Sequence, residues 1–106
     1  MKRGRCEIPL NNEKLLRWRT DFHKALSNPI RLQIVESLLK GERCQCEIFP
    51  EIGLSQSSVS AYLSQLVRAG ILNVRRDGTR KLYSIATPRI FRVLASMHDL
   101  ATETLA

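Results

Sequence analysis

The chain has 106 residues, of which 43% are hydrophobic and 25% charged, proportions typical of one globular domain with a modest core. Seventeen Lys and Arg residues against ten Asp and Glu residues give a formal net charge of +7, which favours a polyanionic partner. Because no apolar run is long enough for a membrane span or a signal peptide, we expect a cytoplasmic protein without a membrane partner, whose three cysteines are mostly reduced.

The amino-terminal part of the chain predicts a basic arm followed by two helices. Residues 1–10 carry three cations and are expected to be a flexible arm, whereas residues 11–106 form the single domain. Asn11 or Asn12 is the expected cap of a first helix that ends near residue 26. Asn28, as a cap, and Pro29, at the first helical position, begin a second helix that ends at residues 40–41 and belongs to the core.

Residues 43–52 are expected to form the first helix of a helix-turn-helix, but the segment is poorly suited to a helix. Pro50 cannot donate to the carbonyl of Cys46, a defect that costs about 3 kcal/mol in a helix interior. We therefore expect this helix either to start late, with Pro50 near its first turn, or to be kinked.

Residues 55–68, here called the recognition helix, predict a helix with one apolar and one polar face. Ser55 is a natural N-cap, and Gly70 stands where a helix ends. The apolar residues at helical spacing are Val59, Leu63, Leu66 and Val67. The opposite face carries short hydroxyl and amide side chains, which can offer donors and acceptors to base edges in a major groove. Taken alone, the segment also fits an ordinary amphipathic surface helix.

The segment that follows predicts a β-hairpin rich in cations. Asp77-Gly78 lies between two extended runs, which is a strong hairpin signal, and residues 75–81 hold four cations and one acid. An edge hairpin protected by charge is one interpretation. A polar helix followed directly by a basic hairpin instead indicates a winged helix-turn-helix, whose wing lies along phosphates while the helix reads bases.

The last helix is expected to run from Pro88 to about Thr104 with an apolar stripe at a spacing of three to four residues. Since little chain remains to cover this stripe, we expect the last helix to form a seam with a second protomer. The alternative is that the last helix packs back onto the first helix of its own chain. The predicted fold is thus mainly α with a β-hairpin wing (α+β), with about five helices.

Several motifs resemble the ArsR/SmtB family of metal- and metalloid-responsive winged-helix repressors. These motifs are residues 25–35 (ALSNPIRLQIV), 44–47 (CQCE) and 54–63 (LSQSSVSAYL). The resemblance covers about residues 22–85 and implies a transcriptional repressor that is a homodimer joined through its first and last helices. It also implies that this repressor binds a double-stranded DNA operator and releases it when an inducer binds. Tyr62 stands where the family often has His, and Ala61 where a larger polar or basic residue is common, so both bear on operator preference.

The Cys44-x-Cys46 motif is open to three explanations. The two side chains could be incidental, they could form a thiol redox switch, or they could bind a soft ion as thiolates. Residues two apart in a regular helix point about 200° from one another, so joint ligation needs a frayed helix start or an unwound helix. A ligand that forces such a change would alter the platform under the recognition helix, which is the differential interaction that an allosteric switch requires.

The resemblance favours a metal or metalloid inducer, because the family's Cys-x-Cys motif followed by an acid is matched by Cys44, Cys46 and Glu47. It also makes Cys6 the natural third ligand, since some members complete the site with a cysteine from the amino-terminal arm. Three thiols favour arsenic(III) or antimony(III), and a fourth ligand would make cadmium or lead competitive. We expect no permanent cofactor. A redox- or sulfide-responsive repressor that uses Cys44 and Cys46 is the alternative.

The expected DNA-binding residues lie on the recognition helix and the wing. They are Ser57, Ser58, Ala61 and Gln65 near base edges, Ser55, Gln56, Ser60 and Arg68 at base edges or phosphates, and Arg75, Arg76, Arg80 and Lys81 on the wing. An enzyme is not expected, because His23 and His98 lie on separate predicted helices without a supporting motif. A protein–protein adaptor that uses the same scaffold without DNA is a third class, against which the basic wing argues.

Overall fold

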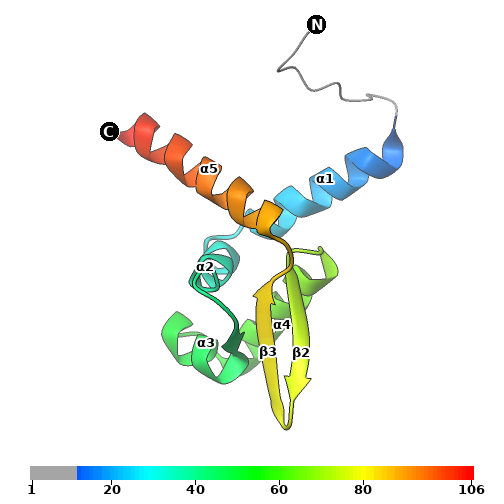
Figure 1. Cartoon of the computed structure of the whole chain (residues 1–106), viewed down its shortest axis with the longest axis vertical. Helices are drawn as coiled ribbons and strands as arrows, with labels where there is room; N and C mark the ends of the chain where they lie inside the picture. The colour runs from blue at the N-terminus through cyan, green and yellow to red at the C-terminus, as the bar shows by residue number, and fades with distance from the viewer. Residues whose placement is uncertain (1–11) are drawn as a thin grey trace, which may run out of the picture.

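The computed structural model describes residues 12–106 (Figure 1), so the predicted arm at residues 1–10, with Cys6, lies outside the described residues. Over this range the elements follow in the order α1 (Glu13–Leu26), α2 (Pro29–Ser37), β1 (Arg43–Cys44), α3 (Gln45–Ile52), α4 (Gln56–Arg68), β2 (Leu72–Asp77), β3 (Arg80–Ile85) and α5 (Pro88–Leu105). The predicted winged helix-turn-helix is confirmed, with α3 and α4 as the helix-turn-helix and β2 and β3 as the wing.

A polar side chain caps the start of α1, α2, α4 and α5. The Asn12 carboxamide accepts a hydrogen bond from the Leu15 N–H at 2.9 Å. Asn28 accepts from two N–H groups of the first turn of α2, at 2.8 and 3.1 Å. Ser55 caps α4 and Thr87 caps α5, where the hydroxyl accepts from the Arg89 N–H at 3.1 Å. These caps satisfy N–H groups that have no partner within the helix, which is why the local signals located the helix starts.

The hydrophobic core lies between α2, α3, α4, the base of the wing and the first turns of α5. Its fully buried members are Ile34, Val35, Ile48, Val59, Leu63, Leu66 and Ile71, with Leu38, Leu72 and Leu94 nearly so. The predicted apolar face of the recognition helix is confirmed, except that Val67 is only partly buried. Burial of each such side chain stabilises the fold by about 1.5–3 kcal/mol, and it fixes the rotation of α4 about its axis.

The helix expected over residues 43–52 begins later, because Arg43 and Cys44 form a strand instead. This strand, β1, pairs antiparallel with β3, Arg43 opposite Tyr83 and Cys44 opposite Leu82. The sheet therefore has three strands in the order β1-β3-β2, where the sequence predicted a hairpin alone. Pairing with β3, together with the Glu47 carboxylate that accepts from the Cys44 N–H, gives this segment hydrogen-bond partners outside a helix. Pro50 lies in the second turn of α3, not its first.

The predicted hairpin is confirmed, but its turn lies one residue later than Asp77-Gly78. Asp77 pairs with Arg80, so the two loop residues are Gly78 and Thr79. Gly78 has φ = 67°, and no non-glycine residue among residues 12–106 has a positive φ. A glycine with positive φ at the first of two loop positions is the pattern of a type II′ turn, whose twist suits a hairpin.

The helices α1 and α5 leave much of their apolar surface exposed. α5 buries Ile90 and Leu94 against the core, and α1 buries Phe22 and Ala25. The large apolar side chains that stay exposed on these two helices are Leu16, Trp18, Phe91, Val93, Met97, Leu100 and Leu105. The two helices diverge on the side of the domain opposite the wing tip (Figure 1), so α5 does not fold back along α1. Among residues 12–106 no helix is long and apolar enough to span a membrane.

Candidate nucleic-acid interface and cysteine pair

The outer face of α4 carries the side chains that the sequence predicted for base reading. Ser57, Ser58, Ala61 and Arg68 are exposed, because the buried residues of α4 fix the opposite side of the helix in the core. Ser60 and Gln65 are half-buried on the flanks of this face. Gln65 lies on the flank towards α1, where it lines a shallow cavity of about 220 Å³.

Three serines form a hydrogen-bonded cluster at the amino-terminal end of α4. The Ser55 hydroxyl accepts a hydrogen bond from the Ser58 N–H at 3.2 Å and donates one to the Ser58 hydroxyl at 2.9 Å. The Ser57 hydroxyl lies 3.3 Å from that of Ser55. The first turn of a helix carries a partial positive charge and suits a phosphate. Ser55 therefore has a structural role as a cap, and its contact with DNA stays a prediction.

A groove of about 420 Å³ separates α4 from the wing. Its lining residues are Ser64, Val67, Arg68, Val74, Arg75, Arg76, Lys81 and Tyr83. Arg76 and Lys81 are cross-strand partners, so their side chains emerge next to each other. Burial raises the pKa of the Tyr83 phenol, which keeps it neutral, and the charged residues of the lining are all cations. The groove therefore attracts a polyanion.

One wing cation is already paired within the chain. Arg75 Nε and Nη2 donate to the two carboxylate oxygens of Glu42, each at 2.8 Å. These hydrogen bonds lower the pKa of Glu42 and raise that of Arg75. Within residues 12–106, by contrast, Arg76, Arg80 and Lys81 form no ion pair. The four wing cations predicted to lie on phosphates are thus not equivalent.

The two cysteines lie where β1 ends and α3 begins. Cys44 is the N-cap of α3, and its Sγ accepts a hydrogen bond from the Cys46 N–H at 3.1 Å. Glu47 completes a capping box, since its carboxylate accepts from the Cys44 N–H at 2.8 Å. Cys44 is buried, only 2% exposed, whereas Cys46 is exposed.

The sulfur atoms of Cys44 and Cys46 are joined in a disulfide, with their Cα atoms 5.1 Å apart, although the sequence led us to expect reduced thiols. Because Cys44 is extended (φ −73°, ψ 146°) and precedes the helix, the 200° separation of a regular helix does not apply to this pair. The pair stands at a helix start, which is the arrangement that joint engagement of both sulfurs requires. Since Cys44 is paired with β3 and caps α3, the pair adjoins both the wing and the helix-turn-helix.

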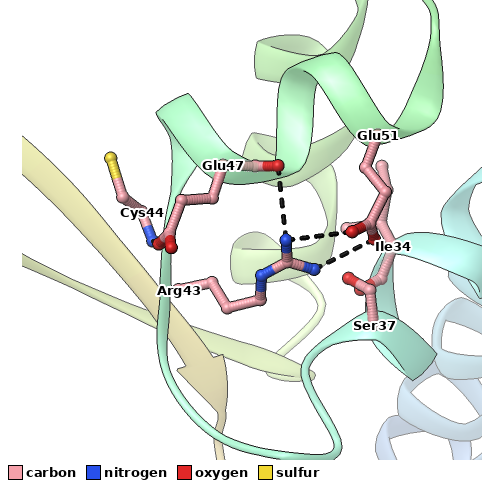
Figure 2. Close-up of polar contacts among 6 residues, drawn as sticks. All are labelled: Ile34, Ser37, Arg43, Cys44, Glu47 and Glu51. Atoms are coloured by element: carbon pink, nitrogen blue, oxygen red, sulfur yellow. Dashed lines mark hydrogen bonds and ion pairs between the residues drawn. The ribbon is translucent and has the colours of Figure 1, made fainter.

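Arg43, the residue before Cys44, links β1 to α3 through hydrogen bonds (Figure 2). Its two terminal nitrogens bind the Glu51 carboxylate at 3.0 and 3.1 Å, and Nη2 also donates to the Glu47 carbonyl at 3.3 Å. This pair raises the pKa of Arg43 and lowers that of Glu51. In the sequence, the acids four and eight residues after Arg43 are only a weak signal for this role. No local pattern indicates Glu42, because its partner lies 33 residues away.

Tyr62 and Ala61, the two departures from the family pattern, lie in different surroundings. Ala61 is exposed on the outer face of α4. Tyr62 is half-buried, and the Arg31 guanidinium lies 5.4 Å from the centre of its ring. Arg31 also donates to the Ala25 carbonyl at 2.8 Å and to the Lys24 carbonyl at 3.1 Å. Tyr62 therefore helps to hold α4 against the end of α1.

The described residues supply two sulfurs to the predicted metal site. No group of three or more His, Cys, Asp or Glu side chains in this part of the chain lies close enough to hold a metal ion. Cys6, the predicted third ligand, is outside the described residues. The structure thus brings Cys44 and Cys46 together, while a three-thiol site stays a prediction.

Comparisons with known proteins agree with this architecture. The family model "Bacterial regulatory protein, arsR family" matches residues 28–74. A "Probable mercury resistance operon repressor" of Streptomyces lividans is 38% identical over 85 residues, which cover 80% of this chain and 68% of that protein. The homodimeric winged helix-turn-helix DNA-binding domain of Mb0332 from Mycobacterium bovis superposes with a TM-score of 0.86 at 33% identity, over 96% of this chain and 94% of that one. Rv0081 of Mycobacterium tuberculosis superposes with a TM-score of 0.81 at 36% identity, over 89% and 95% of the two chains. The chain therefore belongs to the arsR family, whose members are DNA-binding transcriptional regulators and not enzymes.

Proposed function

We propose that the chain is a homodimeric repressor that leaves its operator when a thiophilic ion, with arsenic(III) or antimony(III) as the leading candidates, binds the thiolates of Cys44 and Cys46. The position of Cys44 carries this proposal. This residue ends the strand that pairs with the wing, and it caps the helix that precedes α4. A ligand on its sulfur therefore acts on the supports of both candidate DNA-binding elements.

Operator binding is assigned to the outer face of α4 and to the cationic groove beside it. Ser57, Ser58, Ala61 and Gln65 would contact base edges, while Arg68 and the cations of the wing would contact phosphates. The exposure of the α4 face, the cationic lining of the groove and the net charge of +7 support this division. Phosphate contacts of this kind give most of the affinity and make it depend on salt.

The dimer is assigned to α1 and α5. Trp18 on α1 and Val93, Met97 and Leu100 on α5 are large apolar side chains that stay exposed in the single chain. Covering them against a second copy would remove this apolar surface from water. The M. bovis relative, described as a homodimeric DNA-binding domain, supports this assignment.

A soft ion suits the cysteine pair because thiolates prefer thiophilic ions. In the reduced pair, the exposed Cys46 thiolate would be open to an incoming ion, with the Cys44 sulfur beside it. The name of the S. lividans relative, which refers to mercury resistance, supports a soft-ion inducer. Arsenic(III) and antimony(III) prefer three sulfurs, and Cys6 would supply the third, whereas a fourth ligand would favour cadmium or lead.

Ion binding and DNA binding would be coupled because Cys44 Sγ is both the cap of α3 and a ligand of the ion. Cys44 Sγ accepts the Cys46 N–H in the first turn of α3, and an ion bound to this sulfur competes for its lone pairs. Loss of an N-cap costs about 0.5–2 kcal/mol. Loss of the cap contributes to the coupling only to the extent that the DNA-bound form needs the intact cap, and coupling energies in allosteric proteins are typically about 1–3 kcal/mol.

A second candidate is a repressor that responds to oxidants or to sulfide through the same pair. The specific observation that favours it is the disulfide between Cys44 and Cys46. In this reaction an oxidant takes two electrons from the two thiols, the S–S bond forms, and two protons are released. The exposed Cys46 is the thiol that an oxidant would reach first.

The test is a DNA-binding titration by fluorescence anisotropy on an operator that the protein selects from a random library. It is run with arsenite, cadmium or the thiol oxidant diamide on wild type and on Cys6→Ser, Cys44→Ser and Cys46→Ser. We expect arsenite to weaken wild-type binding at least tenfold and to have no effect on Cys44→Ser or Cys46→Ser. The Cys6→Ser variant decides whether a third thiol takes part. Release by diamide alone would select the redox candidate, and release that persists in the Cys44→Ser and Cys46→Ser variants would refute both.

A further inference from the structure

A transverse row of the sheet connects the cysteine pair with the wing. Cys44 on β1 lies opposite Leu82 on β3, and Leu82 in turn lies opposite Arg75 on β2. Cross-strand partners share a face of the sheet, so these three side chains emerge on the same side. Cys44 and Leu82 are both buried, although neither belongs to the main core cluster.

An ion pair crosses the same region. Glu42, two residues before Cys44, accepts two hydrogen bonds from Arg75 at 2.8 Å, although the two residues are 33 positions apart in the chain. The Arg75 side chain is 59% exposed and that of Glu42 is 33% exposed, so the pair is open to competition from solution. Arg75 also lines the cationic groove between α4 and the wing.

We propose that Glu42 is a positioning residue that competes with DNA phosphate for Arg75 and makes this competition depend on the state of the cysteine pair. The proposal rests on the proposed function, because it needs DNA to lie along the wing, and its link to the cysteines rests on the redox candidate, in which the joined sulfurs mark the form of low DNA affinity. A carboxylate presents two oxygens to a guanidinium in the same bidentate manner as a phosphate, so one excludes the other at Arg75. In each protomer, Glu42 therefore prevents Arg75 from binding one DNA phosphate.

The link to the cysteines follows from the chain itself. Glu42 and Arg43 lead directly into Cys44, and Arg43 is fixed to α3 through Glu51. A change at Cys44 that shifts β1 must therefore move Glu42 relative to β2. The structure, in which the two sulfurs are joined, has Arg75 bound to Glu42. We assign this arrangement to the form of low DNA affinity.

The test compares Glu42→Gln with Glu36→Gln, a matched control that removes the same charge from an exposed α2 side chain with no ion pair among residues 12–106. Operator affinity is measured at a series of salt concentrations between about 50 and 200 mM. Each additional phosphate contact steepens the plot of log K against log salt by about 0.9, so we expect a change of about 1–2 for a dimer of Glu42→Gln. The affinity advantage of this variant should then grow about 4- to 16-fold as salt falls over this range.

Two further measurements complete the design. The Glu42→Gln change is repeated in an Arg75→Gln background, where it should leave the slope unchanged. The ratio of operator affinities with reduced and with diamide-oxidised protein should be several-fold smaller in Glu42→Gln than in wild type. A Glu42→Gln slope equal to that of Glu36→Gln, or a change that persists without Arg75, would overturn the competition. An unchanged oxidation ratio would overturn the link to the cysteines, whereas wild type that selects no DNA would refute the proposed function instead.

Discussion

Replacing Cys44 by alanine and by serine separates its role as a helix cap from its role as a ligand. Cys44 Sγ accepts the Cys46 N–H at 3.1 Å in a buried position at the start of α3. Serine keeps an acceptor at this position and is among the preferred N-cap residues, whereas alanine has none. Neither variant can bind a thiophilic ion through residue 44, so both should lose the response to arsenite.

The free energies of unfolding of the two variants should differ by the contribution of the cap. Ser-to-Ala replacement at an N-cap costs about 0.5–2 kcal/mol, so the free energy of unfolding of Cys44→Ala should be about 1 kcal/mol lower than that of Cys44→Ser. Cys46 is exposed and its sulfur caps nothing, so Cys46→Ala should lie within about 0.5 kcal/mol of wild type.

The assay is urea unfolding with excess reductant, so that the pair is a dithiol, at one fixed protein concentration because a dimer unfolds in a concentration-dependent way. With a urea dependence of about 2 kcal/mol per M, a loss of about 1 kcal/mol moves the midpoint by about 0.5 M. The assigned cap is wrong if Cys44→Ala and Cys44→Ser unfold at the same midpoint. It is equally wrong if Cys46→Ala loses as much as Cys44→Ala.

Four other changes test the fold, the interface and the dimer. Leu63→Ala opens a cavity at a fully buried position and should lower the free energy of unfolding by about 2–5 kcal/mol, which thermal or urea unfolding will detect. Gln65→Ala should reduce operator discrimination by about 1–3 kcal/mol, measured as the ratio of Kd values for operator and mismatched DNA. Arg80→Ala should weaken all DNA alike and lower the salt slope by about 1–2 for a dimer, and an unchanged slope would remove Arg80 from the interface. Met97→Glu should shift the sedimentation coefficient from dimer to monomer, and a persisting dimer would count against the α1–α5 interface.

The parts of the fold that sequence could predict depend on local chemistry. Asn12, Asn28 and Ser55 act on N–H groups within three residues, so a short window of sequence reveals them. The buried face of α4 follows from helical spacing in the same way. These signals are sufficient for the helix-turn-helix and for the presence of a hairpin.

The parts that sequence could not predict depend on distant partners. The strand β1 has only two residues, and it exists because β3, far later in the chain, offers a free edge. Glu42 looks like a solvated surface acid until the fold brings it to Arg75. The sequence places both cysteines in a segment expected to be a helix that starts late or is kinked, and helical spacing gives no hint of the extended cap at Cys44. The cysteines can therefore be predicted from the sequence, but the residues that connect them to the wing cannot.

If binding of arsenite to Cys44 and Cys46 lowers the affinity for DNA, then DNA must lower the affinity for arsenite by the same factor, because coupling between two binding sites is reciprocal. The most direct measurement is therefore the dissociation constant of arsenite for the reduced protein, determined by calorimetry in the absence and in the presence of saturating operator. We predict that operator weakens arsenite binding by the factor by which arsenite weakens operator binding, at least about tenfold. Equal arsenite affinity for the free and the DNA-bound protein would contradict the proposed mechanism.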